Sequence, residues 1–163
     1  MEVKEGLAAL LEKSGYEVKT EEDPGADLFA QKKDKYRYFL KIVQYGLEEM
    51  RQGMEAVEKR RQQMEQSGQF VLVYPCTVCG KTPEPPCEKC AGITGGGGCR
   101  LVTREEARLI EQIEDKGINI WGFDTIKGMV FLLGGSYPKD PSFIRELNRG
   151  GAVAKPHISL IRR

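Results

Sequence analysis

Five cysteines crowd into 24 consecutive positions, and four of them form two Cys-x-x-Cys pairs. A two-residue gap lets both thiolates of a pair reach one ion from a tight turn. Two pairs supply four soft ligands, which suit tetrahedral Zn²⁺ and leave no open coordination position. We therefore expect a structural zinc site whose ligands are Cys76, Cys79, Cys87 and Cys90.

Other readings of the cysteine segment stay open. Cys99 is either a spare thiol or replaces a member of one pair, and the set could consist of free or redox cysteines or hold an iron–sulfur cluster. An odd count packed into one segment fits a secreted disulfide scaffold poorly. The run Gly95–Gly98 is not followed by Lys-Ser/Thr, so we interpret it as a flexible return rather than a phosphate-binding loop.

A lysine interrupts the otherwise apolar end of the expected strand at 36–44. Burying the amine of Lys41 is costly unless a carboxylate or a phosphate meets it. Asp27, on the neighbouring expected strand, is the obvious partner. The alternatives are a purely structural Asp27–Lys41 pair or a lysine that extends to solvent.

Basic residues also gather where a polar hairpin is expected, between the second and third strands: Lys32, Lys33, Lys35 and Arg37. Such a group could bind the phosphates of DNA or RNA, with Tyr36, Tyr38 or Trp121 near enough to stack on bases. A charged surface that is merely solvated is the plain alternative.

The elements that must position these residues follow from hydrophobic periodicity. Antiparallel strands come first and strand–helix–strand units follow, which predicts an α/β fold with a mixed sheet between helices. The apolar stripe of the longest helix is typical of core packing. The expected helices are 3–14, 47–66 and 104–116, and the expected strands are 16–18, 26–31, 36–44, 69–74, 118–121 and 129–133.

Composition limits the class of protein. The 163 residues suffice for about one domain, and a formal charge of +1 argues against a polybasic protein held to nucleic acid by bulk charge. No apolar run approaches the ~20 residues that span a bilayer, and the first residues lack a signal-peptide pattern, so we expect a cytoplasmic location. We divide the chain into a domain at 1–135, with the zinc loop inserted at 75–100, and a basic C-terminal extension at 136–163.

Three short stretches resemble the Mrr-type branch of the restriction-endonuclease-like superfamily. They are Leu10–Val18, with its Gly-Tyr-x-Val step, then Gly25–Leu28 and Phe39–Lys41. The resemblance covers about residues 3–121 and implies a restriction-endonuclease-like fold with the cysteine loop as an insertion. In active members, carboxylates hold Mg²⁺ or Mn²⁺ and a lysine stabilises charge on the attacking water or the phosphate. Asp27 matches the metal-binding aspartate, Lys41 the motif lysine, and Glu5 the helix glutamate of some members.

Phe39 departs from the family pattern, because it stands where a second acid or a glutamine belongs. An aromatic ring cannot coordinate Mg²⁺, which relies on hard oxygen ligands. We therefore expect a zinc-stabilised nucleic-acid-binding protein with a nuclease-like fold and degenerate catalysis. The alternatives are an active divalent-metal-dependent endonuclease that uses Glu5, Asp27 and Lys41, and a zinc-stabilised adaptor that binds other proteins. The methionine-rich helix at 47–66 also suggests a homodimer.

Overall fold

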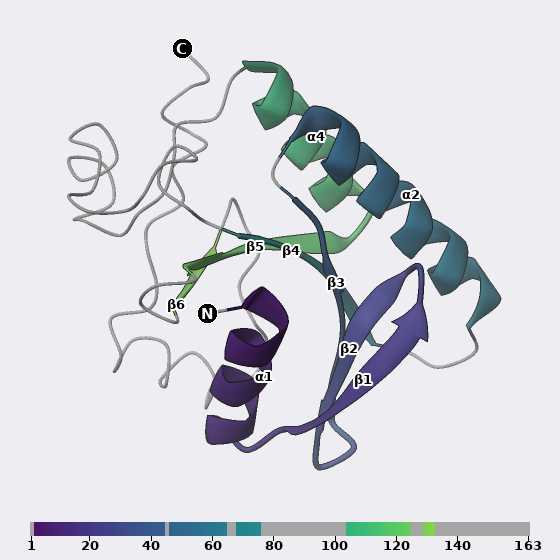
Figure 1. Cartoon of the computed structure of the whole chain (residues 1–163). Helices are drawn as coiled ribbons and strands as arrows, with labels where there is room; N and C mark the ends of the chain where they lie inside the picture. Colours follow the sequence, from purple (N-terminus) through teal and green to yellow (C-terminus); the bar gives the residue numbers. More distant parts are fainter. Residues whose placement is uncertain (1, 45, 65–67, 76–103, 125–128, 133–163) are drawn as a thin grey trace, which may run out of the picture.

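The computed structural model describes residues 2–44, 46–64, 68–75, 104–124 and 129–132. Within these ranges the chain forms three helices and six strands (Figure 1). The helices are α1 (Val3–Lys13), α2 (Leu47–Gln63) and α4 (Arg104–Asp115). The strands are β1 (Glu17–Asp23), β2 (Ala26–Lys32), β3 (Tyr36–Ile42), β4 (Gln69–Pro75), β5 (Ile118–Asp124) and β6 (Met129–Leu132).

The six strands form one mixed sheet in the order β1-β2-β3-β4-β5-β6. Strands β1, β2 and β3 are an antiparallel meander, and β5 and β6 are also antiparallel. Helix α2 connects β3 to the parallel strand β4, and α4 connects β4 to the parallel strand β5. The predicted mixed α/β architecture is confirmed. Strand β1 is longer than the expected 16–18, because it pairs with β2 as far as Asp23.

The helices cover the two faces of the sheet (Figure 1). On one face α2 and α4 pack against a core that includes Phe39, Val43 and Leu72. On the other face α1 packs against a second core that includes Tyr38 and Leu40. The side chains of β3 therefore alternate between the two cores, as the period of two predicts.

Strand β4 lies inside the sheet, and the five residues 70–74 are all buried. Its apolar sequence on both faces is explained by helices on both sides. In α2 the core-facing residues Met50, Met54 and Val57 are buried against the sheet. The methionine stripe is thus core, as expected, and it is not an exposed seam for a second copy.

Several predictions fall on residues that lie outside the described ranges. These include the proposed zinc ligands Cys76, Cys79, Cys87 and Cys90, the fifth cysteine Cys99, and the basic extension at 136–163. In the described part of the chain, none of the helices has the length and apolar character needed to cross a bilayer.

Candidate functional site

Asp27 and Lys41 meet across β2 and β3, as the sequence predicts. Leu28 pairs with Leu40 in the antiparallel ladder, so Asp27 and Lys41 lie opposite each other one step further along the two strands. Lys41 Nζ lies 3.6 Å from Asp27 Oδ2. The same carboxylate oxygen accepts a 2.7 Å hydrogen bond from the backbone N–H of Ile42. Asp27 thus has a structural task at the end of β3 as well as an ion pair.

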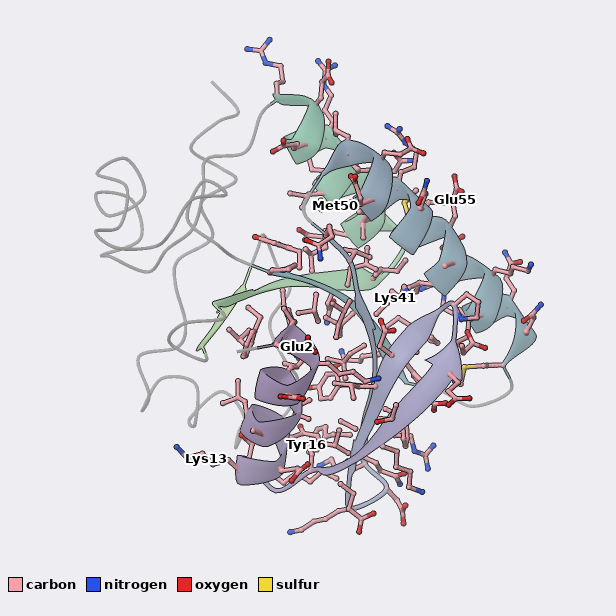
Figure 2. All side chains as sticks on the ribbon, viewed as in Figure 1. Glu2, Lys13, Tyr16, Lys41, Met50 and Glu55 are labelled. Atoms are coloured by element: carbon pink, nitrogen blue, oxygen red, sulfur yellow. The ribbon has the colours of Figure 1, made fainter. Side chains whose placement is uncertain are left out.

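An open pocket of about 310 Å³ lies beside this pair, between the end of β3 and the first half of α2. Its polar lining residues are Lys41, Gln44, Glu49 and Gln52. The side chains of Lys41 and Asp27 are 21% and 30% exposed, so the pair is accessible from solvent. Figure 2 shows Lys41 in the region between the strands and α2.

The apolar lining of the pocket comes from the β1–β2 turn, β3 and α2. Pro24, Val43 and Ala56 contribute side chains, and Gly53 brings the helix backbone close to the strand. A Cβ at Gly53 would lie 2.5 Å from Val43 Cγ1, so the missing side chain is what permits this close approach. The packing of α2 on β3 therefore fixes the shape of the pocket.

Phe39 stands at the motif position of the second acid, and its side chain is buried there. Its side chain is 2% exposed. The ring stacks on Phe70 at 4.9 Å between centroids and contacts Phe29 at the same distance. The guanidinium carbon of Arg60 lies 5.3 Å from the ring centroid. Phe39 is therefore a core residue and does not line the pocket beside Lys41.

Arg60 is a residue that sequence reasoning missed. It is 13% exposed and forms ion pairs with Glu21 at 3.5 Å and with Asp23 at 3.3 Å. Asp23 Oδ1 also accepts a 2.7 Å hydrogen bond from the backbone N–H of Gly25. The Gly25 N–H and the Arg60 guanidinium hold the pKa of the Asp23 carboxyl below its usual value of 3.8. Arg60 thus ties the β1–β2 turn to α2, directly above Phe39.

One signal in the sequence could have revealed this cation. Arg60 follows Val57 by three residues, on the core-facing side of the helix, where an arginine requires acidic partners. The acids Glu21 and Asp23 flank the expected turn at 22–25 and are the natural partners. The neighbouring Arg61 instead pairs within α2, at 2.6 Å from Glu58.

Glu5 is not brought into the Asp27–Lys41 pair. It is exposed on α1, which packs on the sheet face opposite to α2 (Figure 1). Among the residues that the structure describes, no three acidic, histidine or cysteine side chains form a group able to hold a metal ion. The role of Glu5 as a metal ligand stays a prediction.

The lysines of the basic hairpin between β2 and β3 differ in their contacts. Lys32 Nζ donates a 3.1 Å hydrogen bond to the Ser14 carbonyl and lies 5.4 Å from the Tyr16 ring centroid, so it fastens the hairpin to the end of α1. Lys33 and Lys35 are exposed at the tip. Lys33 has a φ of 51°, in the left-handed region that a lysine rarely adopts.

Two of the three aromatic residues expected to stack on bases are not available. Tyr38 and Trp121 are fully buried in the core beneath α1, with their rings 5.5 Å apart. This expectation is wrong, because Tyr38 shares a strand face with Leu40 and that face is covered by α1. Tyr36, in contrast, is half-buried beside the hairpin tip, with Lys35 Nζ 5.3 Å from its ring centroid.

Comparisons with known proteins give no match to this chain, either among family models, among curated proteins or among solved structures.

Proposed function

We propose that this chain is a divergent relative of the Mrr-type restriction-endonuclease-like proteins, and that it binds DNA or RNA without cutting it. Two features support the proposal. The described elements follow the order helix, three antiparallel strands, helix, strand, helix and two strands. Asp27 and Lys41 stand on the second and third of those strands with 3.6 Å between Nζ and Oδ2.

The observation that carries the loss of catalysis is the burial of Phe39. Mg²⁺ prefers several hard oxygen ligands, and carboxylates supply the charged ones. Asp27 is the carboxylate that pairs with Lys41, and its Oδ2 is already engaged by the Ile42 N–H and by Lys41. The neighbouring motif position holds a ring that is stacked between other rings and covered by Arg60. A divalent ion would therefore bind weakly.

Binding without cleavage would depend on cations at both ends of β2 and β3, because the hairpin tip lies at the end of these strands opposite to the Asp27–Lys41 pair. Lys33 and Lys35 stand at the tip of the hairpin, and Lys41 is open to the pocket. Each phosphate that a lysine neutralises releases condensed counterions, so affinity falls as salt rises. Lys32 contributes less directly, because its amine is bound to the Ser14 carbonyl.

A structural zinc ion belongs to the same proposal. Cys76, Cys79, Cys87 and Cys90 would bind it as a closed four-thiolate site, which stabilises a loop and performs no catalysis. Metal analysis of the purified protein should give one zinc per chain, and a Cys87→Ser variant should lose it.

The experiment for the proposal is a fluorescence-anisotropy titration with labelled single-stranded DNA, double-stranded DNA and RNA at several salt concentrations. A Lys33→Gln/Lys35→Gln variant should bind more weakly and show a log–log salt slope smaller by about 1–2. Lys19→Gln/Lys59→Gln is the matched control, because it also removes two exposed lysines, one on β1 and one on α2, and neither belongs to the hairpin. Equal affinity of both variants and the wild type would contradict the role of the hairpin.

A second function, a working endonuclease that depends on Mg²⁺ or Mn²⁺, is favoured by the intact Asp27–Lys41 pair and its opening to the pocket. Metal-dependent cleavage that disappears in Asp27→Ala would establish it. Capture of other proteins without any affinity for nucleic acid would instead favour an adaptor.

A further inference from the structure

The pocket beside Lys41 is lined by a combination of residues that the proposed loss of catalysis does not explain. It combines apolar walls with two amide side chains, one cation and one carboxylate. We propose that this pocket binds a single unpaired base and selects guanine through the Glu49 carboxylate. This inference deepens the proposed function, because it rests on the binding of nucleic acid and names the base that the site would take.

The size of the pocket fits one base. Its volume of about 310 Å³ lies at the lower end of the range of small-molecule sites, roughly 300–1,000 Å³. A base within a duplex is stacked and paired, so it enters such a pocket only after it leaves the stack. We therefore expect single strands, loops or ends to be the ligands. The apolar side chains of Pro24, Val43 and Ala56 offer surface for the faces of a ring.

Glu49 is the residue that we expect to recognise the base. Glu49 lies in the first turn of α2, and its carboxylate occupies the space that a side chain at Gly46 would fill. Glu49 lines the pocket and is exposed, so its carboxylate is accessible to a ligand.

Hydrogen-bond complementarity selects guanine. An ionised carboxylate is a pure acceptor with two oxygens, and it forms its strongest contacts with two parallel donors. Guanine presents two adjacent donors, N1–H and the 2-amino group. Adenine and cytosine each present one amino group beside an acceptor, and uracil and thymine present one N–H between two carbonyls. Only guanine therefore matches both oxygens of Glu49.

The other polar residues complete the site. The Lys41 amine is a donor and can bind the guanine O6 or a phosphate of the same nucleotide. The amides of Gln44 and Gln52 supply both donors and acceptors for the remaining edge. Guanosine monophosphate and an unpaired guanine in a strand offer the same edge and a phosphate, so both are sources of the same ligand chemistry.

The test compares short single-stranded oligonucleotides that differ at one central base in an otherwise uniform thymine background. The oligonucleotide with a central guanine should bind about tenfold more tightly than the one with hypoxanthine, the base of inosine, which lacks only the 2-amino group. Glu49→Gln should abolish this difference and Gln52→Ala should weaken guanine binding. Glu55→Gln should leave the guanine preference and the affinity for guanine unchanged, because it removes the same charge from the outward side of α2 (Figure 2). Calorimetry with guanosine monophosphate alone tests the pocket without a strand.

Each outcome separates the pocket from the proposed function. Binding of all oligonucleotides with equal affinity, or the same loss in Glu49→Gln and Glu55→Gln, overturns the guanine pocket and leaves nucleic-acid binding in place. Binding of guanosine monophosphate that depends on Glu49, without binding of any oligonucleotide, supports the pocket and contradicts the proposed function. No binding of either ligand overturns both.

Discussion

Replacement of Phe39 by alanine tests whether this residue is a core side chain rather than an altered site residue. The structure shows a ring that is 2% exposed, stacked on Phe70 and in contact with Phe29. The Arg60 guanidinium covers it from the side of α2. Phe39→Ala would remove all of these contacts and leave a cavity between the helix and the sheet.

The magnitude follows from these contacts. Removing a buried phenylalanine side chain costs about 3–5 kcal/mol of unfolding free energy. Two aromatic pairs of the observed spacing contribute about 0.5–1.5 kcal/mol each beyond burial, which puts Phe39→Ala near the upper end, at about 4–5 kcal/mol. Phe39→Leu keeps most of the volume and loses the ring contacts, so about 1–2 kcal/mol is expected. Domains of this size have about 5–15 kcal/mol in total, so the leucine variant should stay folded.

The assay is urea unfolding followed by tryptophan fluorescence. Trp121 is the sole tryptophan of the chain and is fully buried in the core beneath α1, on the sheet face opposite to Phe39. Its emission therefore reports loss of the whole sheet rather than a local change around position 39. The midpoint in urea and the slope with denaturant give the free energy of unfolding for each variant.

Two results would contradict the assignment of Phe39 to the core. One is a loss of less than about 1 kcal/mol in Phe39→Ala, which is far below the cost of emptying a packed core. The other is a large loss of nucleic-acid affinity in Phe39→Leu at unchanged stability, which would mean that the ring stacks on bases. Phe39→Glu completes the series: it should destabilise the fold and gain no Mg²⁺-dependent cleavage, because position 39 does not face the pocket.

Three further predictions concern single contacts. The unfolding free energy of Asp27→Ala should be about 1–2 kcal/mol lower than that of Asp27→Asn, because only alanine leaves the Ile42 N–H without its side-chain acceptor. Equal urea midpoints of the two variants would contradict this. The Asp23 carboxyl has a lowered pKa, so its stabilising contribution is complete near pH 5 and is lost as the pH falls through 3.8 toward the lower pKa of the folded state. The difference in urea midpoint between wild type and Asp23→Asn should therefore shrink between pH 5 and pH 3, and a constant difference would refute it. Lys33→Gly should raise the unfolding free energy by about 0.5–1 kcal/mol, because glycine tolerates the positive φ at this position. The same variant should bind DNA or RNA more weakly, because it lacks the lysine charge. A destabilised variant would show that the backbone at Lys33 is not strained.

Local periodicity was sufficient to predict most of the fold. The alternation in β3 places Phe39 and Val43 in one core and Tyr38 and Leu40 in the other, as a strand between two layers of helices requires. Strand β4 was expected inside the sheet because it is apolar on both faces, and it lies there. The Asp27–Lys41 pair was predictable, since a lysine in an apolar strand needs an acid on the neighbouring strand.

Periodicity assigns a residue to a face but does not say what covers that face. This is why Tyr38 and Trp121 were expected near a ligand and are instead buried beneath α1. The same limit applies to Lys32, whose amine binds the end of α1, and to Arg60, which joins a helix to a turn that is distant in the sequence. Such contacts depend on the relative placement of elements, which the spacing of apolar residues does not encode.

Binding of nucleic acid without cleavage, through a nuclease-like fold, is the function that we propose for this chain. The most direct measurement follows binding of a labelled single-stranded oligonucleotide at low salt with Mn²⁺ present, and then determines the length of the oligonucleotide in the same samples. We expect saturable, salt-sensitive binding with the oligonucleotide intact. Cleavage that depends on Asp27, or no binding at the lowest salt, would contradict it.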